Sequence, residues 1–211
     1  MSGVWNLSPI ERSSTLEQVQ PGAHLRELHL ARELETSRGT VREAIRHLVQ
    51  EGLVEYVLHR GNFVNALSLR DRLDVYVARE AIEVGVARRL LQTDAPADLA
   101  PLEEAMDELR REVEGHTRPT EEVIAADLRF HQELVRLAGS PRLDRAYDTL
   151  AAETRMLLRH HPDYPWQTYV EDHEKLLFAL RDGDPRLPDL VVEHLRLSVD
   201  LLRGEIAGAA A

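Results

Sequence analysis

The chain has 211 residues, a formal net charge of −11 at neutral pH and no cysteine. The absence of cysteine excludes disulfide bonds and thiolate metal sites, so any metal ion must be held by histidine and carboxylate side chains. Neither an apolar run of membrane-spanning length nor a charged leader followed by an apolar segment is present. The sequence therefore predicts a soluble, cytoplasmic protein without a membrane partner, built as one large or two modest domains.

The first predicted elements lie between residues 35 and 65. A Ser/Thr start signal precedes a helix in which Arg38, Arg42 and Arg46 are four residues apart, so at 3.6 residues per turn their side chains form one stripe. Gly52 is expected to end this helix. Off the stripe, and expected to pack inward, are the apolar residues Ala44, Ile45, Leu48 and Val49.

Two β-rich runs follow this helix, residues 53–57 and 62–64, joined by His59, Arg60 and Gly61. A short helix, a second helix with an arginine face and a hairpin with a basic tip together predict a winged helix-turn-helix that binds DNA through the major groove. An arginine face that is merely solvated is the alternative, and the position of the hairpin favours DNA. The predicted DNA-binding residues are Ser37, Arg38, Thr40, Arg42, Arg46, Arg60 and Gly61.

The acidic net charge is concentrated away from this segment. In residues 1–66, seven arginines against eight acidic residues give a net charge of −1, which leaves −10 of the total of −11 for the rest of the chain. Screening limits the reach of charges to about 8–10 Å at ordinary salt, so the local distribution decides phosphate binding. In the surrounding sequence, only Glu43 and Glu51 oppose the four arginines. Strong non-specific DNA binding is not expected.

From about residue 69 onward the sequence predicts helices alone. Apolar residues recur at helical spacing, and clusters of Pro, Gly and Asp separate the segments. The predicted helices span residues 70–92, 96–114, 120–138, 141–160, 166–181 and 185–205. The chain is therefore expected to be mainly α, with a winged helix-turn-helix in residues 1–66 and a six-helix bundle in residues 70–206.

Four residues of the bundle form a candidate metal site. Asp127 and His131 are four residues apart, so both side chains leave one face of a helix about one turn apart. His173 and His194 lie in two later amphipathic helices, on or near their apolar faces. Converging in the core, this set would suit zinc, nickel, manganese or iron. Separate core histidines with local hydrogen bonds are the alternative, and His160 and His161 are weaker candidate ligands.

One family resemblance is carried by the stretch L-A-R-E-L-E-T-S-R-G-T-V-R-E-A-I-R-H-L-V-Q-E-G-L-V followed by R-G-N-F-V. It resembles the DNA-binding domain of the GntR family of bacterial transcription regulators over roughly residues 20–66. Gly39 and Thr40 stand where the family usually has Thr-Pro or a similar pair. A glycine near a helix N-terminus loosens that end, so the local base contacts are expected to differ.

A second resemblance is carried by D-L-R-F-H-Q-E-L-V-R-L-A-G-S-P-R-L, by D-H-E-K-L-L-F-A-L-R-D-G-D and by E-H-L. These segments look like the FCD effector-binding domain of the FadR subfamily, and six helices place the chain nearer the VanR-like branch. In many members of that family this pattern binds a divalent metal. The resemblance implies that the ligands here, with zinc as the expected ion, are Asp127, His131, His173 and His194.

Arg79 is the predicted effector-binding residue, because a guanidinium group can bind a carboxylate through two hydrogen bonds. An intrahelical pair with Glu83 is the alternative role. The expected protein is thus a homodimeric regulator of operator DNA, a repressor in the commoner arrangement of the family, that responds to a small carboxylic or sugar acid. A regulator that senses the metal itself and a metal-dependent enzyme are the alternatives. No catalytic motif such as H-E-x-x-H is present, so an enzyme is not expected.

Overall fold

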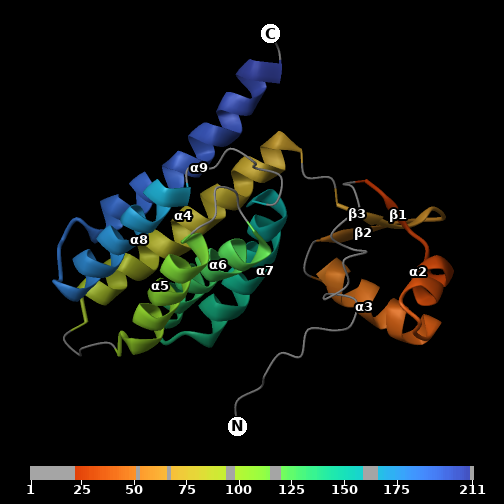
Figure 1. Cartoon of the computed structure of the whole chain (residues 1–211), viewed down its shortest axis with the longest axis horizontal. Helices are drawn as coiled ribbons and strands as arrows, with labels where there is room; N and C mark the ends of the chain where they lie inside the picture. Colours follow the sequence, from red (N-terminus) through yellow and green to blue (C-terminus); the bar gives the residue numbers. More distant parts are fainter. Residues whose placement is uncertain are drawn as a thin grey trace. The chain divides into compact units, whose positions relative to one another are not determined.

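The computed structural model describes residues 22–50, 53–65, 68–93, 98–114, 120–158 and 166–209. The chain divides into two compact units, residues 1–67 and residues 68–211, coloured orange and yellow to blue in Figure 1. The first unit holds two described helices and a small sheet, and the second holds only helices. The predicted fold class, a winged helix-turn-helix followed by an all-α domain, is confirmed.

The first unit is a helix pair with a three-stranded antiparallel sheet. Helix α2 (Glu27–Glu33) precedes α3 (Arg38–Gln50), and the strands are β1 (His24–Leu25), β2 (Val54–Val57) and β3 (Gly61–Val64) in the order β1-β3-β2. Strands β2 and β3 form the predicted hairpin, with Val54 opposite Val64 and Val57 opposite Gly61. Strand β1 was not predicted, because two residues show no alternation and only their pairing with β3 makes them a strand.

The core of the first unit contains the apolar face of α3. Its buried residues, from α2, α3, β1 and β2, are Leu25, Leu30, Ala31, Val41, Ala44, Ile45, Leu48 and Val54. The prediction was wrong for Val49, which is 36% exposed, because at 100° per residue it lies at the edge of the face that Val41, Ala44, Ile45 and Leu48 form. Gly52, the predicted end of this helix, lies outside the described residues.

The second unit contains six helices in its described residues, as the sequence predicted. They are α4 (Leu69–Leu91), α5 (Ala100–Val113), α6 (Glu121–Arg136), α7 (Pro141–Leu158), α8 (Trp166–Arg181) and α9 (Leu187–Ala209). Helix α5 begins four residues later than predicted, with Pro101 in its first turn, and α9 continues four residues beyond the predicted end. None of the described helices combines the length and apolar character that a membrane crossing requires.

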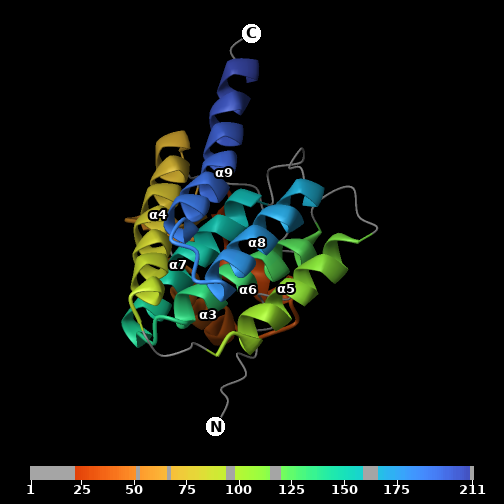
Figure 2. The same ribbon diagram turned by 90° about the vertical axis from the view of Figure 1, so that its left-hand side faces the viewer.

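Local side-chain bonds explain where two of these helices start. Ser68 and Asp71 form a capping box at the start of α4, and the Thr120 hydroxyl accepts a hydrogen bond from the Val123 amide at the start of α6. Helix α4 packs along α9 and also contacts α6, α7 and α8, while α6 packs between α5 and α7 (Figure 2). Side chains that point inward from α4, α6, α7, α8 and α9 therefore share one core.

Candidate functional sites

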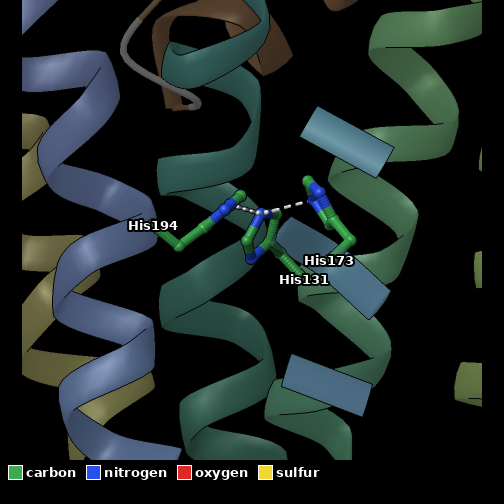
Figure 3. A group of neighbouring side chains, drawn as sticks. All are labelled: His131, His173 and His194. Atoms are coloured by element: carbon green, nitrogen blue, oxygen red, sulfur yellow. Dashed lines mark hydrogen bonds between the residues drawn. The ribbon is translucent and has the colours of Figure 1, made fainter. Parts of the chain in front are cut away.

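Three predicted metal ligands meet in the core of the second unit. His131 on α6, His173 on α8 and His194 on α9 turn their rings toward a common point (Figure 3). All three are at most 3% exposed. Burying three imidazoles is costly unless their nitrogens find hydrogen-bond or metal partners, so the contacts of each ring are informative.

The distances between the three rings match those of ligands around one metal ion. The Nε2 atom of His131 lies 3.2 Å from Nε2 of His173 and 3.1 Å from Nε2 of His194. Zinc–nitrogen bonds of about 2.0–2.1 Å at angles between octahedral and tetrahedral values would separate neighbouring nitrogens by about 2.9–3.4 Å. Both distances fall in this range, and one ring nitrogen of each histidine lies within 4.8 Å of the other two, as ligands of one ion require.

The opposite nitrogens of two rings fix where their protons lie. Nδ1 of His131 is 2.8 Å from a carboxylate oxygen of Glu83, and Nδ1 of His173 is 2.7 Å from the backbone oxygen of Tyr169. Both oxygens are acceptors, so in each neutral ring the proton is on Nδ1 and Nε2 carries a bare lone pair. Two lone pairs that face each other at 3.2 Å repel, and a cation between them turns that repulsion into coordination.

Asp127 is the fourth predicted ligand, and it lies beside His173 at the edge of the histidine cluster. One of its carboxylate oxygens lies 3.1 Å from Nε2 of His173, and the residue is fully buried. Neither oxygen accepts a hydrogen bond from the described residues. A buried carboxylate without donors is costly, and its position beside an imidazole nitrogen fits a fourth ligand to a cation.

Arg79 takes part in a buried network next to this cluster. Its Nε atom donates to a Glu83 oxygen at 2.9 Å, and the Tyr147 hydroxyl donates to the same oxygen at 2.6 Å. Through its other oxygen, Glu83 accepts the bond from His131. One of the two roles weighed for Arg79 is observed, because its Nε makes the pair with Glu83. Its Nη1 and Nη2 atoms have no hydrogen-bond partner among the described residues, and the effector-binding role stays a prediction.

The electrostatics of the cluster favour a charged Glu83 and neutral His131 and His194. Burial by itself would raise the pKa of Glu83, but Arg79 and His131 outweigh it and lower the pKa to about 2. Burial lowers the pKa of His131, and it lowers the pKa of His194 well below the usual value. Neutral imidazoles are the form that binds metal.

The charges of the cluster do not balance within the described residues. One buried arginine, Arg79, faces two buried carboxylates, Glu83 and Asp127, in the same cluster as the three histidines. These three charges sum to −1, and a bound divalent cation would change the sum to +1. The carboxylate of one bound anion would then neutralise the cluster. The unpartnered groups beside the cluster, Nη1 and Nη2 of Arg79 and Nδ1 of His194, are nitrogens that can donate to such an anion.

Some site residues were missed by sequence reasoning, and others cannot be placed. The bond from Glu83 to His131 joins residues 48 positions apart, and no local pattern indicates it. The Tyr147 hydroxyl, which donates to Glu83 from 64 positions away, was missed for the same reason. His160 and His161, the weaker candidate ligands, lie outside the described residues.

The candidate DNA interface is the exposed side of α3. Ser37 precedes the helix, and its hydroxyl accepts a hydrogen bond from the Thr40 amide at 3.1 Å, which caps the N-terminus. The side chains of Arg38, Arg42 and Arg46 are 60%, 55% and 64% exposed. The three arginines thus lie exposed along α3, and Ser37 and Thr40 are exposed at its N-terminal end.

A carboxylate from another helix meets this stripe. Glu27 on α2 accepts two hydrogen bonds from Arg42, at 3.0 and 3.2 Å, and one of its oxygens lies 3.8 Å from Arg38. Local sequence indicates only Glu43 and Glu51 as opposing charges, whereas Glu27 is fifteen positions away from Arg42. Glu27 therefore holds the Arg42 guanidinium in a defined orientation on the exposed surface.

The hairpin tip carries the remaining predicted DNA-binding residues. The Arg60 guanidinium lies over the ring of Phe63, 5.2 Å from its centroid. The His24 ring stacks on the same Phe63 ring, with the two centroids 4.7 Å apart. Gly61 has a φ of 101°, and a Cβ there would stand 2.7 Å from the His24 ring. Only glycine fits this position, so Gly61 shapes the tip, and Arg60 is the charged group on it.

Comparison with known proteins agrees with both units. Residues 15–64 match the family model of bacterial regulatory proteins of the gntR family, and residues 74–197 match the FCD domain. A protein of Paenarthrobacter nicotinovorans, described as a probable D-xylose utilization operon transcriptional repressor, is 32% identical over 82% of this chain and 76% of its own length. The transcriptional repressor RspR of Escherichia coli K12 is 28% identical over 84% of this chain and 78% of its own.

A solved structure has the same architecture. A GntR transcriptional regulator from Rhodococcus sp. RHA1 superimposes with a TM-score of 0.73 at 29% identity, over 88% of this chain and 89% of that one. These relatives are regulators and not enzymes, which confirms the expectation that the chain is not an enzyme. The chain belongs to the GntR family of bacterial DNA-binding transcription regulators, with an FCD domain as its C-terminal unit.

Proposed function

We propose that the protein is a repressor whose affinity for operator DNA is set by a small carboxylate bound at a metal site in the helical unit. The observation that carries the proposal is the meeting of three buried imidazoles, two of which direct bare Nε2 lone pairs at each other across 3.2 Å. Of the possible partners for such a cluster, a divalent cation matches the donors, the distances and the missing positive charge.

The proposed ligands are His131, His173, His194 and Asp127, with zinc as the expected ion. Glu83 and the Tyr169 carbonyl orient two of the rings through their Nδ1 protons. When bound, the ion would supply a positive charge and a coordination position for an anionic ligand. Arg79 would bind the same anion, because its Nη1 and Nη2 atoms are buried and lack partners. A small carboxylic or sugar acid fits both requirements.

Control of DNA binding is proposed to follow from a population shift between arrangements of a homodimer. One recognition helix contacts too few base pairs to select a site in a genome, whereas two helices related by a two-fold axis read a two-part operator. An acid that favours one arrangement by about 1–3 kcal/mol changes the affinity for DNA by roughly 5–150-fold. The repressor role is supported by two related proteins that are described as transcriptional repressors.

Elemental analysis of protein purified without a histidine tag tests the metal. We expect about one divalent ion per chain in the wild type and a loss of at least tenfold in occupancy in H173A. His29 supplies a matched control, because its side chain is 68% exposed on α2 and H29A should retain the ion. Undiminished metal in H173A would mean that the ligands are wrongly assigned.

A DNA-binding titration in the presence of carboxylic and sugar acids tests the effector. We expect one of these acids to release operator DNA from metal-loaded protein, and the same acid to have little effect after chelation or on R79M. Release by added metal alone, with no acid, would instead identify the ion as the signal. Metal-free protein that still responds to the acid would remove the metal from the mechanism.

A further inference from the structure

The side of α3 that faces away from the core of the first unit has a glycine at its outermost point. One face of this helix is buried, and its residues are Val41, Ala44, Ile45 and Leu48. At about 100° per residue, Gly39 lies roughly 180° around the helix from the centre of that face, and it is exposed. At this point α3 therefore presents backbone atoms to the outside.

Nothing in the described part of the protein requires a glycine at this position. Gly39 is not among the described residues with positive φ, so its backbone conformation suits any residue. A Cβ built on it would meet the Ser37 Oγ atom at 3.6 Å, which is an ordinary van der Waals distance. Alanine is intrinsically more favourable than glycine in a helix. Gly39 thus lowers the stability of α3 without a compensating contact inside the chain.

Two arginines of the candidate DNA interface flank this bare position. Arg38 precedes Gly39, and Arg42 lies three residues further along, where its Cβ is about 5–6 Å away on the helix surface. Their guanidiniums lie 3.8 and 3.0 Å from a carboxylate oxygen of Glu27 on α2. Both charged groups are therefore drawn to the α2 side of Gly39.

The dimensions of a DNA major groove make the missing side chain significant. The groove is about 12 Å wide and 8.5 Å deep, and a helix with its side chains is about 10–12 Å across, although its Cα atoms lie only about 2.3 Å from its axis. A side chain at the outermost point holds the backbone away from the groove floor. A glycine at this point allows the edge of a base pair to reach the Cα atom directly.

The chemistry of this bare surface favours one base. The group that Gly39 exposes beyond its peptide bonds is a CH2, which neither donates nor accepts an ordinary hydrogen bond. A donor or acceptor of a base edge that is pressed against it loses water without gaining a partner. The C5-methyl group of thymine is the apolar feature that the four bases offer in the major groove. A thymine methyl group is therefore the best match for Gly39.

We propose that Gly39 is a specificity-determining residue, whose bare Cα receives the methyl group of one operator thymine beside the bases that Arg38 and Arg42 read. This inference rests on the docking of α3 against DNA and deepens it, because it assigns a role to a residue through the side chain that it lacks. The stability lost by having glycine in the helix is then offset by a contact that exists only on DNA.

The variant G39A tests the close approach. The probe is an operator selected from random double-stranded DNA by the full-length wild-type protein. We expect G39A to bind it roughly tenfold more weakly in fluorescence anisotropy, as for one mismatched base pair, because the added methyl group occupies the space of the thymine methyl. Its melting temperature in circular dichroism should equal or exceed that of the wild type, since alanine is the better helix residue. Equal affinity and equal base preference in G39A would overturn the assignment.

Uracil substitution tests the thymine, because uracil differs from thymine only in lacking the methyl group. Each thymine of the selected operator is replaced in turn. We expect one replacement to weaken binding by the wild type about fourfold, equivalent to about 0.8 kcal/mol for one buried methyl group, and to have a much smaller effect on G39A. Uracil profiles that are identical in the two proteins would show that Gly39 does not contact a thymine methyl.

A control on the same helix and a separate variant complete the experiment. His47 is exposed on α3 eight residues from Gly39, about 12 Å along the axis, so H47A should keep the uracil profile of the wild type. R42A tests the docking itself. If R42A and G39A both bind like the wild type, DNA does not meet this side of α3. A loss of affinity in R42A with an indifferent G39A would reject the role of Gly39 alone.

Discussion

Each unit of the protein contains a glutamate–arginine pair of nearly the same length in opposite surroundings. In the DNA-binding unit, Glu27 binds Arg42 at 3.0 Å, with side chains 24% and 55% exposed. In the helical unit, Glu83 binds Arg79 at 2.9 Å, with side chains 0% and 1% exposed. Water can solvate the charges of the first pair, whereas only neighbouring side chains can stabilise the charges of the second.

The difference between the pairs shows how burial assigns a role to the same chemistry. Water compensates Glu27 and Arg42 when they separate, so Arg42 can exchange its carboxylate for a base or a phosphate at little cost. Glu83 and Arg79 cannot separate without leaving a buried charge, so they define a fixed framework around His131. The adaptable pair lies where a large ligand approaches, and the fixed pair orients a small site.

The largest expected effect comes from removing the buried carboxylate. Glu83→Ala should lower the free energy of unfolding by about 3–5 kcal/mol, because it leaves Arg79 buried without its counterion and His131 without its acceptor. Chemical denaturation followed by circular dichroism measures the loss. If E83A is insoluble, R79M/E83M should restore folding, since it removes both charges. A loss below about 1 kcal/mol in E83A would show that this pair behaves like an exposed one.

The pH dependence of stability in metal-free protein is the next largest effect. The folded-state pKa of Glu83 is about 2, below the usual value of 4.5, so its stabilisation is present above pH 4.5 and is lost as the pH falls toward 2. The shift corresponds to roughly 3 kcal/mol. Lowered pKa values of His131 and His194 act in the same direction below pH 6.5, because the unfolded chain takes up protons there and the folded chain does not.

Denaturant titrations between pH 7 and pH 3, after treatment with a chelator, measure this slope. We expect stability to fall continuously with acidification, first through the histidines and then through Glu83. E27Q should retain nearly the same slope, because Glu27 is only half-buried and solvent screens its pair with the exposed Arg42. Stability that stays constant from pH 6.5 to pH 4 would contradict the assignment of neutral buried imidazoles.

An intermediate effect is expected for DNA binding. Arg42→Ala should weaken binding to the operator by about 1–3 kcal/mol and relax the preference at one base pair, because a base contact would be lost. Fluorescence anisotropy with the operator and with single-base variants measures both changes. Arg111→Ala, an exposed arginine on α5 in the other unit, should leave affinity unchanged. Equal affinity and selectivity in R42A and wild type would reject the proposed docking of α3.

The smallest expected effect is on the exposed pair itself. Glu27→Ala should change the free energy of unfolding by less than about 1 kcal/mol, because solvent and salt screen the pair with Arg42. The same denaturation experiment as for E83A measures the change, so the two glutamates form a matched test of burial. An equally large loss in E27A would mean that the two environments do not differ as their exposures indicate.

Much of the fold followed from local patterns. Arginine spacing and a Ser/Thr start signal placed α3, and two β-rich runs joined by His59, Arg60 and Gly61 placed the β2–β3 hairpin, because such features act over a few residues. The six helices of the bundle were predicted from apolar spacing and Pro/Gly breaks for the same reason. Errors fell where local preference is weak, as at the start of α5 and in the two residues of β1.

The sequence by itself determined the family, the element order and the four candidate ligands, because spacing along a helix and family motifs are properties of short segments. Only the tertiary structure decided which nitrogen of each ring faces its neighbours, since the acceptors are Glu83 on α4 and the Tyr169 carbonyl on α8. It also decided that Glu27 reaches Arg42 and that Arg79 is buried with two nitrogens unpartnered. Burial and partners depend on which helices pack together, and packing joins residues that no local pattern relates.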